Sequence, residues 1–200
     1  MRAIACATAL AVLVVTASYG AVAPPGGAVA SVRDTLTKAS AVVASADTRE
    51  QKLAALHELA RHLMDTREMG RRAIGPRLAE QPTERQEEFL SLFDELIVRS
   101  YLQKLLFFRQ PRFAFGEAEI GQDPVVVHTR ILTDKDEFYV DYTMHQRDGA
   151  WIASDVVIES VSLTQNYSQQ FAELLRSRSF DELLELLRGK VEGLRAKAAS

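Results

Sequence analysis

The sequence predicts an α+β fold in which a curved, four-stranded antiparallel sheet packs against a helical subdomain. Three observations support this prediction. Apolar residues recur at helical spacing as far as Leu105, and they alternate as in strands after Pro111. The gaps between the alternating runs are short, and this indicates antiparallel pairing because a parallel crossover needs a dozen or more residues. The chain of 200 residues is 47% hydrophobic, which is enough apolar material for one domain.

Residues 1–30 have the pattern of a secretory signal peptide. One positive charge, Arg2, precedes an apolar run that is too short for a membrane span of about 20 residues. We expect cleavage near Ala30, because Ala28-Val29-Ala30 places small residues before Ser31. Ala21-Val22-Ala23 is a weaker cleavage site because Pro24 follows it. The alternative to a signal peptide is that residues 1–30 stay uncleaved and act as an anchor.

The only cysteine, Cys6, lies within the apolar run, which argues against a lipid-modified cysteine at the cleavage point. Its removal leaves the exported chain without a thiol, so packing alone must stabilise the fold. The mature chain, residues 31–200, is predicted to form one domain without repeats or linkers. It divides into a helical part (31–110), the sheet (111–160) and two C-terminal helices (164–196).

Four helices are predicted in the helical part. The first spans residues 32–46, and a leucine stripe between Leu53 and Leu63 marks the second. Asp65-Thr66-Arg67-Glu68 resembles a capping box and begins the third, which ends near Gly75-Pro76. The fourth follows Pro82 and presents large apolar residues to the sheet: Phe89, Leu92, Phe93, Leu96, Ile97, Tyr101 and Leu105.

The four strands are predicted at residues 112–118, 124–133, 137–146 and 150–159. Asp148-Gly149, between the last two, is a strong signal for a tight hairpin. Alternation along the third strand places Asp141 on one face, and on the other face it places Phe138, Val140, Tyr142 and Met144. Two amphipathic helices, the first over residues 164–176, follow the last strand.

Composition and motifs argue against several classes of function. The formal net charge is −3 and there is no long basic run, which gives little support for nucleic-acid binding. The sequence has no Gly-rich phosphate loop, no Gly-x-Ser-x-Gly and no cysteine pair. His57 and His62 are five residues apart, so they lie on different sides of a helix and do not converge on a metal.

Asp141 is the strongest candidate for catalysis. A carboxylate beside aromatic residues on a curved sheet can act as a general base, here with Tyr139 or His145 as its partner. The simpler interpretation is a surface residue on the polar face of the strand. Asp155 and Glu159 are likewise expected to form an exposed stripe rather than an acid pair.

The ordered motifs of the second half resemble those of a known family. They are Val140-Asp141-Tyr142, Asp148-Gly149-Ala150-Trp151, Asp155-Val156, Glu159, Val161-Ser162-Leu163, Asn166-Tyr167 and Gln170-Phe171. With earlier pieces such as Arg99-Ser100-Tyr101, they resemble the MlaC family of periplasmic phospholipid-binding proteins, also called the toluene-tolerance auxiliary family. The resemblance covers about residues 32 to 190.

The resemblance implies an exported shuttle in the periplasm. Its expected fold has a deep apolar pocket between a nuclear-transport-factor-like sheet and the helical subdomain. The pocket holds lipid acyl chains, and no cofactor is implied beyond the bound lipid. The implied partners are an MCE-domain subunit of an inner-membrane ABC transporter and an outer-membrane lipoprotein complex. One branch of the family is associated with hopanoids, so the lipid is a phospholipid or a hopanoid.

On this basis we expect a set of apolar residues from the fourth helix and the sheet to bind lipid: Phe93, Leu96, Tyr101, Val140, Tyr142, Met144, Trp151, Val156, Ile158 and Val161. The chain departs from the family pattern at Ser160, where glycine is common, at Ser168, where arginine is common, and around Arg77-Leu78, where an aromatic residue is expected. Two alternatives remain at this point. One is a small-molecule isomerase or lyase that uses Asp141, and the other is a transporter adaptor with a filled core.

Overall fold

The computed structural model describes residues 26–108, 111–118 and 124–199. Four helices and a short 3₁₀ helix precede the sheet, and two helices follow it. The first group is α1 (Gly26–Ala44), α2 (Arg49–Leu63), α3 (Thr66–Ile74), η1 (Gly75–Leu78) and α4 (Thr83–Leu105). The last two helices are α5 (Leu163–Leu174) and α6 (Phe180–Ala199). The predicted α+β class is confirmed.

The sheet is an antiparallel meander in the order β1-β2-β3-β4-β5. Its strands are β1 (Arg112–Ala118), β2 (Val125–Leu132), β3 (Glu137–Arg147), β4 (Ala150–Ile158) and β5 (Val161–Ser162). The two-residue β5, which pairs with the end of β4, makes five strands where four were predicted. The β3–β4 turn is Asp148-Gly149, with φ of 52° and 81°, the positive values that a tight hairpin turn requires.

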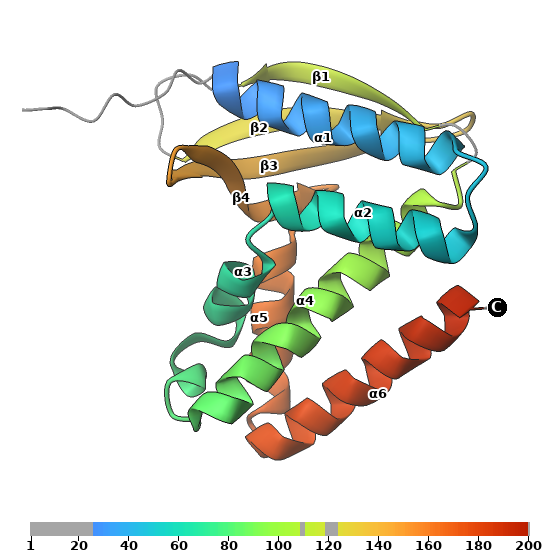
Figure 1. The fold of residues 1–200 in the computed structure, drawn as a ribbon. Helices are drawn as coiled ribbons and strands as arrows, with labels where there is room; N and C mark the ends of the chain where they lie inside the picture. Colours follow the sequence, from blue (N-terminus) through green and yellow to red (C-terminus); the bar gives the residue numbers. More distant parts are fainter. Residues whose placement is uncertain (1–25, 109–110, 119–123, 200) are drawn as a thin grey trace, which may run out of the picture.

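Helices cover one face of the sheet and extend beyond it. Figure 1 shows α1 lying across the sheet and α2 beneath α1, whereas α3 to α6 extend away from the sheet. Alternation along β3 buries Val140, Tyr142 and Met144 on the helix-covered face, which we call the inner face. The core is therefore built between this face and the helices.

A cluster of aromatic rings fills the space among α4, α5 and α6. The rings of Phe89 and Phe171 meet edge to face with centroids 5.5 Å apart, and those of Phe93 and Tyr167 do so at 5.4 Å. Phe180 adds a ring from α6, 5.8 Å from Phe89. All five rings are buried, and such pairs stabilise a core beyond their buried area.

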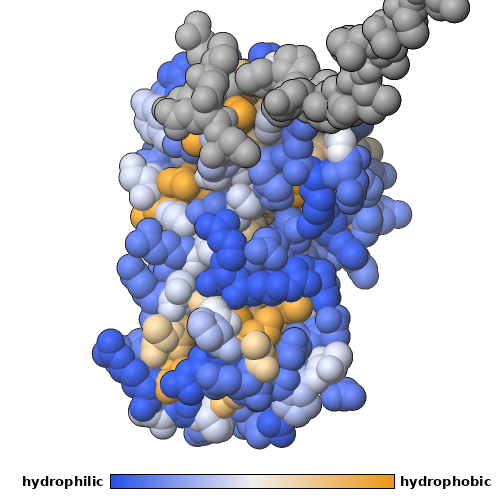
Figure 2. Space-filling model, turned by 90° about the vertical axis from the view of Figure 1, so that its left-hand side faces the viewer, coloured by the Kyte–Doolittle hydropathy of each residue, from blue (hydrophilic) through white to orange (hydrophobic). Residues whose placement is uncertain are grey.

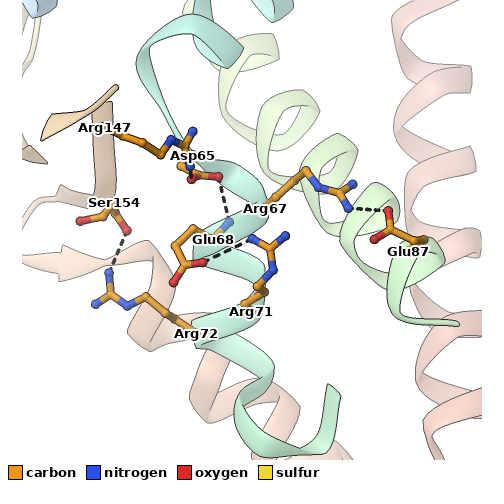
Figure 3. Close-up of polar contacts among 8 residues, drawn as sticks. All are labelled: Asp65, Arg67, Glu68, Arg71, Arg72, Glu87, Arg147 and Ser154. Atoms are coloured by element: carbon orange, nitrogen blue, oxygen red, sulfur yellow. Dashed lines mark hydrogen bonds and ion pairs between the residues drawn. The ribbon is translucent and has the colours of Figure 1, made fainter. Parts of the chain in front are cut away.

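Asp65 joins the helical part to the sheet. Its carboxylate caps α3 by accepting the backbone N–H of Glu68 at 3.0 Å, and it pairs with Arg147 at the end of β3. Its own backbone N–H donates to the carbonyl of Ala153 on β4 at 2.9 Å. Figure 3 shows Arg72 reaching the carbonyl of Ser154 from the same helix. These contacts fix the position of α3 against the β3–β4 hairpin.

The start of α1 bears on the expected cleavage site. The helix begins at Gly26, and the side chain of Ala28 is 0% exposed, so cleavage after Ala30 would remove a buried part of the fold. The rest of the expected signal peptide, residues 1–25, lies outside the described residues. Within the part of the chain that the structure describes, no helix has the length and apolar character needed to cross a membrane.

Candidate functional site

A cavity of about 580 Å³ lies between the inner face of the sheet and helices α1, α2 and α4. We call it the main cavity. Its helical walls are apolar residues from three helices: Leu36, Ala39, Leu56, Leu59, Ala60, Leu63, Ile97, Val98, Tyr101, Leu102 and Leu105. Its sheet wall consists of Phe113, Ile131, Phe138, Val140, Tyr142, Val156 and Ile158. The volume is within the usual range for small-molecule sites, about 300 to 1,000 Å³.

The backbone pattern of each element explains why these side chains converge. On β3, every second residue from Phe138 to Tyr142 points inward, and Val140 pairs with Ile158 on β4. On α4, Ile97, Tyr101 and Leu105 recur every fourth residue and so share one face of the helix. Two small residues, Ala39 on α1 and Ala60 on α2, are part of the helical wall.

One end of the main cavity opens to solvent; we call it the mouth. There Phe107, which follows α4, is 71% exposed and yet lines the cavity. The neighbouring Phe108 contacts Phe138 of β3, with ring centroids 5.6 Å apart. Among the described residues that line the cavity, only Lys104 and Glu159 carry a charge, and both are exposed. An apolar interior with charges only on an exposed rim suits an amphiphilic ligand.

Two phenol groups are the main polar features of the interior. Burial raises the pKa of Tyr101, and it raises the pKa of the fully enclosed Tyr142 still further. Both side chains are therefore neutral near pH 7. Neither supplies a charge or a base, and the wall remains apolar in character.

A comparison with known protein families identifies the family of this chain. Residues 30–189 match the family described as MlaC protein. The chain belongs to the MlaC family. The predicted family membership is therefore confirmed, and the match covers most of the chain. No curated protein matches the sequence significantly.

A solved structure from Ralstonia solanacearum has the same fold. It is described as a phospholipid-binding protein in complex with a phospholipid. The TM-score is 0.74 at 22% sequence identity, over 84% of this MlaC-family chain and 98% of the other chain. At this identity the similarity establishes the fold, including the curved antiparallel sheet and its helical cover.

Half of the residues that the sequence nominated for lipid binding line the main cavity. They are Tyr101, Val140, Tyr142, Val156 and Ile158. The other half lie elsewhere. Phe93 and Leu96 pack in the core of the helical part, where the Phe93 ring contacts those of Tyr167 and Phe171 on α5. Met144 is fully buried and does not line the cavity.

The remaining two nominated residues lie outside the cavity for different reasons. Trp151 packs against the start of α1, where a Cβ atom on Gly27 would come within 2.7 Å of the Trp151 Nε1 atom. Val161 is on the two-residue edge strand β5 and is 51% exposed. Lipid binding by any of the ten residues stays a prediction.

The lipid-binding residues predicted from the sequence included none of the cavity-lining residues of α1 and α2. The stripe of Leu56, Leu59, Ala60 and Leu63 was visible as an amphipathic pattern, but the same pattern marks any helix packed on a core. Phe107 was missed because a single aromatic residue after a helix carries no periodic signal.

The catalytic alternative loses its geometric basis. Asp141 is on the outer face of the sheet, and the His128 Nδ1 atom lies 2.8 Å from its Oδ1 atom. It therefore does not face the cavity. No group of three or more metal-ligating side chains occurs among the described residues.

The expectation for Asp155 was wrong. It is only 8% exposed, and it accepts hydrogen bonds from Thr164 and Ser162 at the start of α5. The pairing from Asp155 to Ile158 is regular, so Asp155 keeps the face expected from alternation, and it is buried because the start of α5 lies over it. It is a structural link rather than part of an exposed stripe.

A second cavity, of about 410 Å³, lies among α2, α4 and α6. It is more polar, since Glu50, His57, Arg99 and Arg195 contribute to its wall. Arg99 and Arg195 both bind Glu95, at 2.6 and 2.5 Å, and the pair with Arg195 lowers the pKa of that carboxyl. On the side of α3 and the β3–β4 turn, Figure 2 shows hydrophobic side chains in separate patches among hydrophilic ones.

Proposed function

We propose that this MlaC-family protein is a periplasmic lipid-binding shuttle that carries a phospholipid in the main cavity. The observation that carries the proposal is the apolar cavity of about 580 Å³ whose only charged lining residues, among those described, are on the exposed mouth. The Ralstonia structure, which contains a phospholipid, supports the same use of the fold. A hopanoid is the second candidate ligand, since an apolar wall also accepts a rigid hydrocarbon.

The energetics favour acyl chains in this site. Each methylene moved from water into an apolar wall contributes about 0.8 kcal/mol, so ten buried methylenes contribute about 8 kcal/mol before the cost of ordering the chain. No ion pair is required inside the cavity. The head group stays at the mouth, where water and the charged side chains solvate it.

Membership of the MlaC family supports a transport role. We propose that the protein receives and delivers lipid between an MCE-domain subunit of an inner-membrane ABC transporter and an outer-membrane lipoprotein complex. The proposed location is the periplasm. These partners predict that the purified protein accelerates the exchange of a fluorescent phospholipid between vesicles when a partner complex is present.

Lipid extraction tests the binding proposal. Protein purified from a bacterial host should release phospholipid that mass spectrometry identifies at a fixed ratio to protein. Ala60→Phe places a large ring in the main cavity and should lower that ratio several-fold, because Ala60 is on the cavity wall. Ala54→Phe is the matched control, since Ala54 is on the same helix but exposed and lines only the second cavity.

The proposal fails if delipidated wild-type protein takes up no phospholipid from vesicles. It also fails if both variants retain lipid equally while circular dichroism shows that both are folded.

A further inference from the structure

The two charged residues at the mouth of the main cavity differ in how their charges are engaged. Glu159 is held by the sheet: its Oε1 atom accepts the backbone N–H of Tyr139 at 2.6 Å, and its own N–H donates to the Tyr139 carbonyl at 3.0 Å. The carboxylate therefore closes the end of the β3–β4 pair. Its charge is partly compensated by that backbone donor.

The charge of Lys104 has no such compensating partner among the described residues. Lys104 lies in the last turn of α4, its side chain is exposed, and it makes no ion pair with any described residue. The Nζ atom lies 5.2 Å from the ring centroid of Tyr101, which itself lines the cavity. This cation–π contact holds the ammonium group beside the cavity wall rather than free in solvent.

Two carbonyl groups at the end of α4 already accept hydrogen bonds from the backbone. The carbonyl of Lys104 accepts the N–H of Phe107 at 3.1 Å, and the carbonyl of Leu105 accepts that of Phe108 at 3.2 Å. These bonds satisfy two of the last carbonyl groups of the helix. Two cations are near the mouth: the guanidinium of Arg49 lies 5.3 Å from the ring centroid of Phe107, and the ammonium group of Lys104, which has three N–H donors, lines the cavity itself.

From this asymmetry we infer that Lys104 binds the head-group phosphate of the lipid whose acyl chains fill the main cavity. The inference rests on the proposed function and adds a selectivity to it. Acyl chains that enter the apolar part leave the first polar group of the lipid at the mouth. A phosphate there accepts charge-assisted hydrogen bonds from the ammonium group. A lipid without phosphate, such as a diacylglycerol or a neutral triterpenoid, gains nothing from Lys104.

The test uses two lipids that differ only in the phosphate. Delipidated protein is equilibrated with phosphatidylcholine vesicles that contain equal amounts of dioleoyl phosphatidic acid and dioleoylglycerol, and the bound lipids are quantified by mass spectrometry. Wild type should prefer the phosphatidic acid. Lys104→Met should lower this preference about three- to fivefold, the scale of a partly solvated ion pair, and raised salt should weaken it in wild type.

Two further variants separate the role of Lys104 from general charge effects. Lys104→Arg keeps a cation at the mouth and should keep the preference. Lys190→Met removes the same charge from an exposed position on α6 and should leave the preference at the wild-type value.

The possible outcomes are distinct. An unchanged preference in Lys104→Met, in a protein that binds both lipids, overturns the inference and leaves the proposed function intact. An equal loss in Lys190→Met also overturns it, because the effect is then one of net charge. A wild-type protein that binds neither lipid overturns the proposed function and the inference together.

Discussion

The carboxylate of Asp155 accepts two hydrogen bonds from Thr164, one from its backbone N–H at 3.1 Å and one from its hydroxyl at 2.8 Å. Ser162, the N-cap residue of α5, donates a further hydrogen bond to the same carboxylate. A buried acid at a helix N-terminus is stabilised by these donors and by the helix dipole. Strand β4 is thereby tied to the first turn of α5.

Replacing Asp155 should be costly. Asp155→Ala leaves several buried donors unpaired and should lower the free energy of unfolding by about 2–4 kcal/mol. Asp155→Asn keeps one acceptor oxygen and should cost about half as much. Urea unfolding followed by circular dichroism measures both, with the exposed Asp134→Ala as the control. Equal stability of the alanine variant and wild type would refute the link.

Neighbouring glycines at the start of α1 provide a matched pair. A methyl group on Gly27 would lie 2.7 Å from Nε1 and 3.0 Å from Cδ1 of Trp151, whereas a methyl group on Gly26 meets nothing within 4 Å. Gly27→Ala should therefore destabilise the protein by about 1–3 kcal/mol, and Gly26→Ala should change stability by less than about 1 kcal/mol.

Fluorescence reports this change directly, because Trp151 is the only tryptophan in the chain. Gly27→Ala should shift its emission in the folded state, and Gly26→Ala should not. The measurement requires a chain that retains residue 26, and identical unfolding curves for the two variants would contradict the close approach.

The mature N-terminus is predicted to lie at or before Gly26. Cleavage after Ala30 would delete Ala28, which is fully buried, and would uncover the core around it. The burial of Ala28 thus outweighs the small-residue pattern that favoured the later site. Intact-mass measurement of the exported protein tests this, and a mass that begins at Ser31 would show that the first turn of α1 is dispensable.

Ser160 is predicted to carry backbone strain. Its φ is 65°, in the left-handed region that favours glycine, and the preceding Glu159 is also there at 49°. Ser160→Gly should raise the free energy of unfolding by about 0.5–1 kcal/mol, since glycine adopts this conformation without strain. The reverse change at another turn, Gly149→Ala at φ 81°, should lower it. A loss of stability in Ser160→Gly would mean that entropy of the unfolded chain dominates.

Stability should fall at alkaline pH. Burial raises the pKa of Tyr167 to about 12, above the value near 10 of an unfolded tyrosine. The folded state thus holds its proton longer than the unfolded state does. The stability from this group is fully present below about pH 10 and is lost as the pH rises toward 12.

The urea midpoint should therefore decrease over that pH range. Tyr167→Phe should make the decrease less steep, and Tyr139→Phe, at an exposed position, should leave it unchanged. A decrease that is equally steep in Tyr167→Phe would assign the effect to other groups, such as the enclosed Tyr142, whose pKa burial also raises.

The order of helices and strands was predictable because each element repeats its own period. The stripe on α4 and the alternation on β3 are long enough to separate the two periods, and Asp148-Gly149 fixed the hairpin between β3 and β4. Asp155 was wrongly expected to be exposed because its burial comes from Ser162 and Thr164 at the start of α5, and the alternation of β4 does not report that contact.

The cavity was expected only from the resemblance to the MlaC family, because the residue pattern alone does not reveal it. Val140 and Tyr142 border empty space, whereas Met144, two residues further on the same face, is packed in full contact. The residue types on both sides of that boundary are the same. What decides between a void and a filled core is the distance that α1 and α2 keep from the sheet, and no residue pattern on β3 reports that distance.

The two cavities share part of their walls, because Val98 and Leu102 of α4 line both of them. The boundary there is made of side chains, which change rotamer far faster than helices move. The volume available to a ligand therefore depends on side-chain rotamers as well as on the backbone. If the proposed lipid has tails longer than the main cavity holds, a change of rotamer at Leu102 would extend the space toward the second cavity.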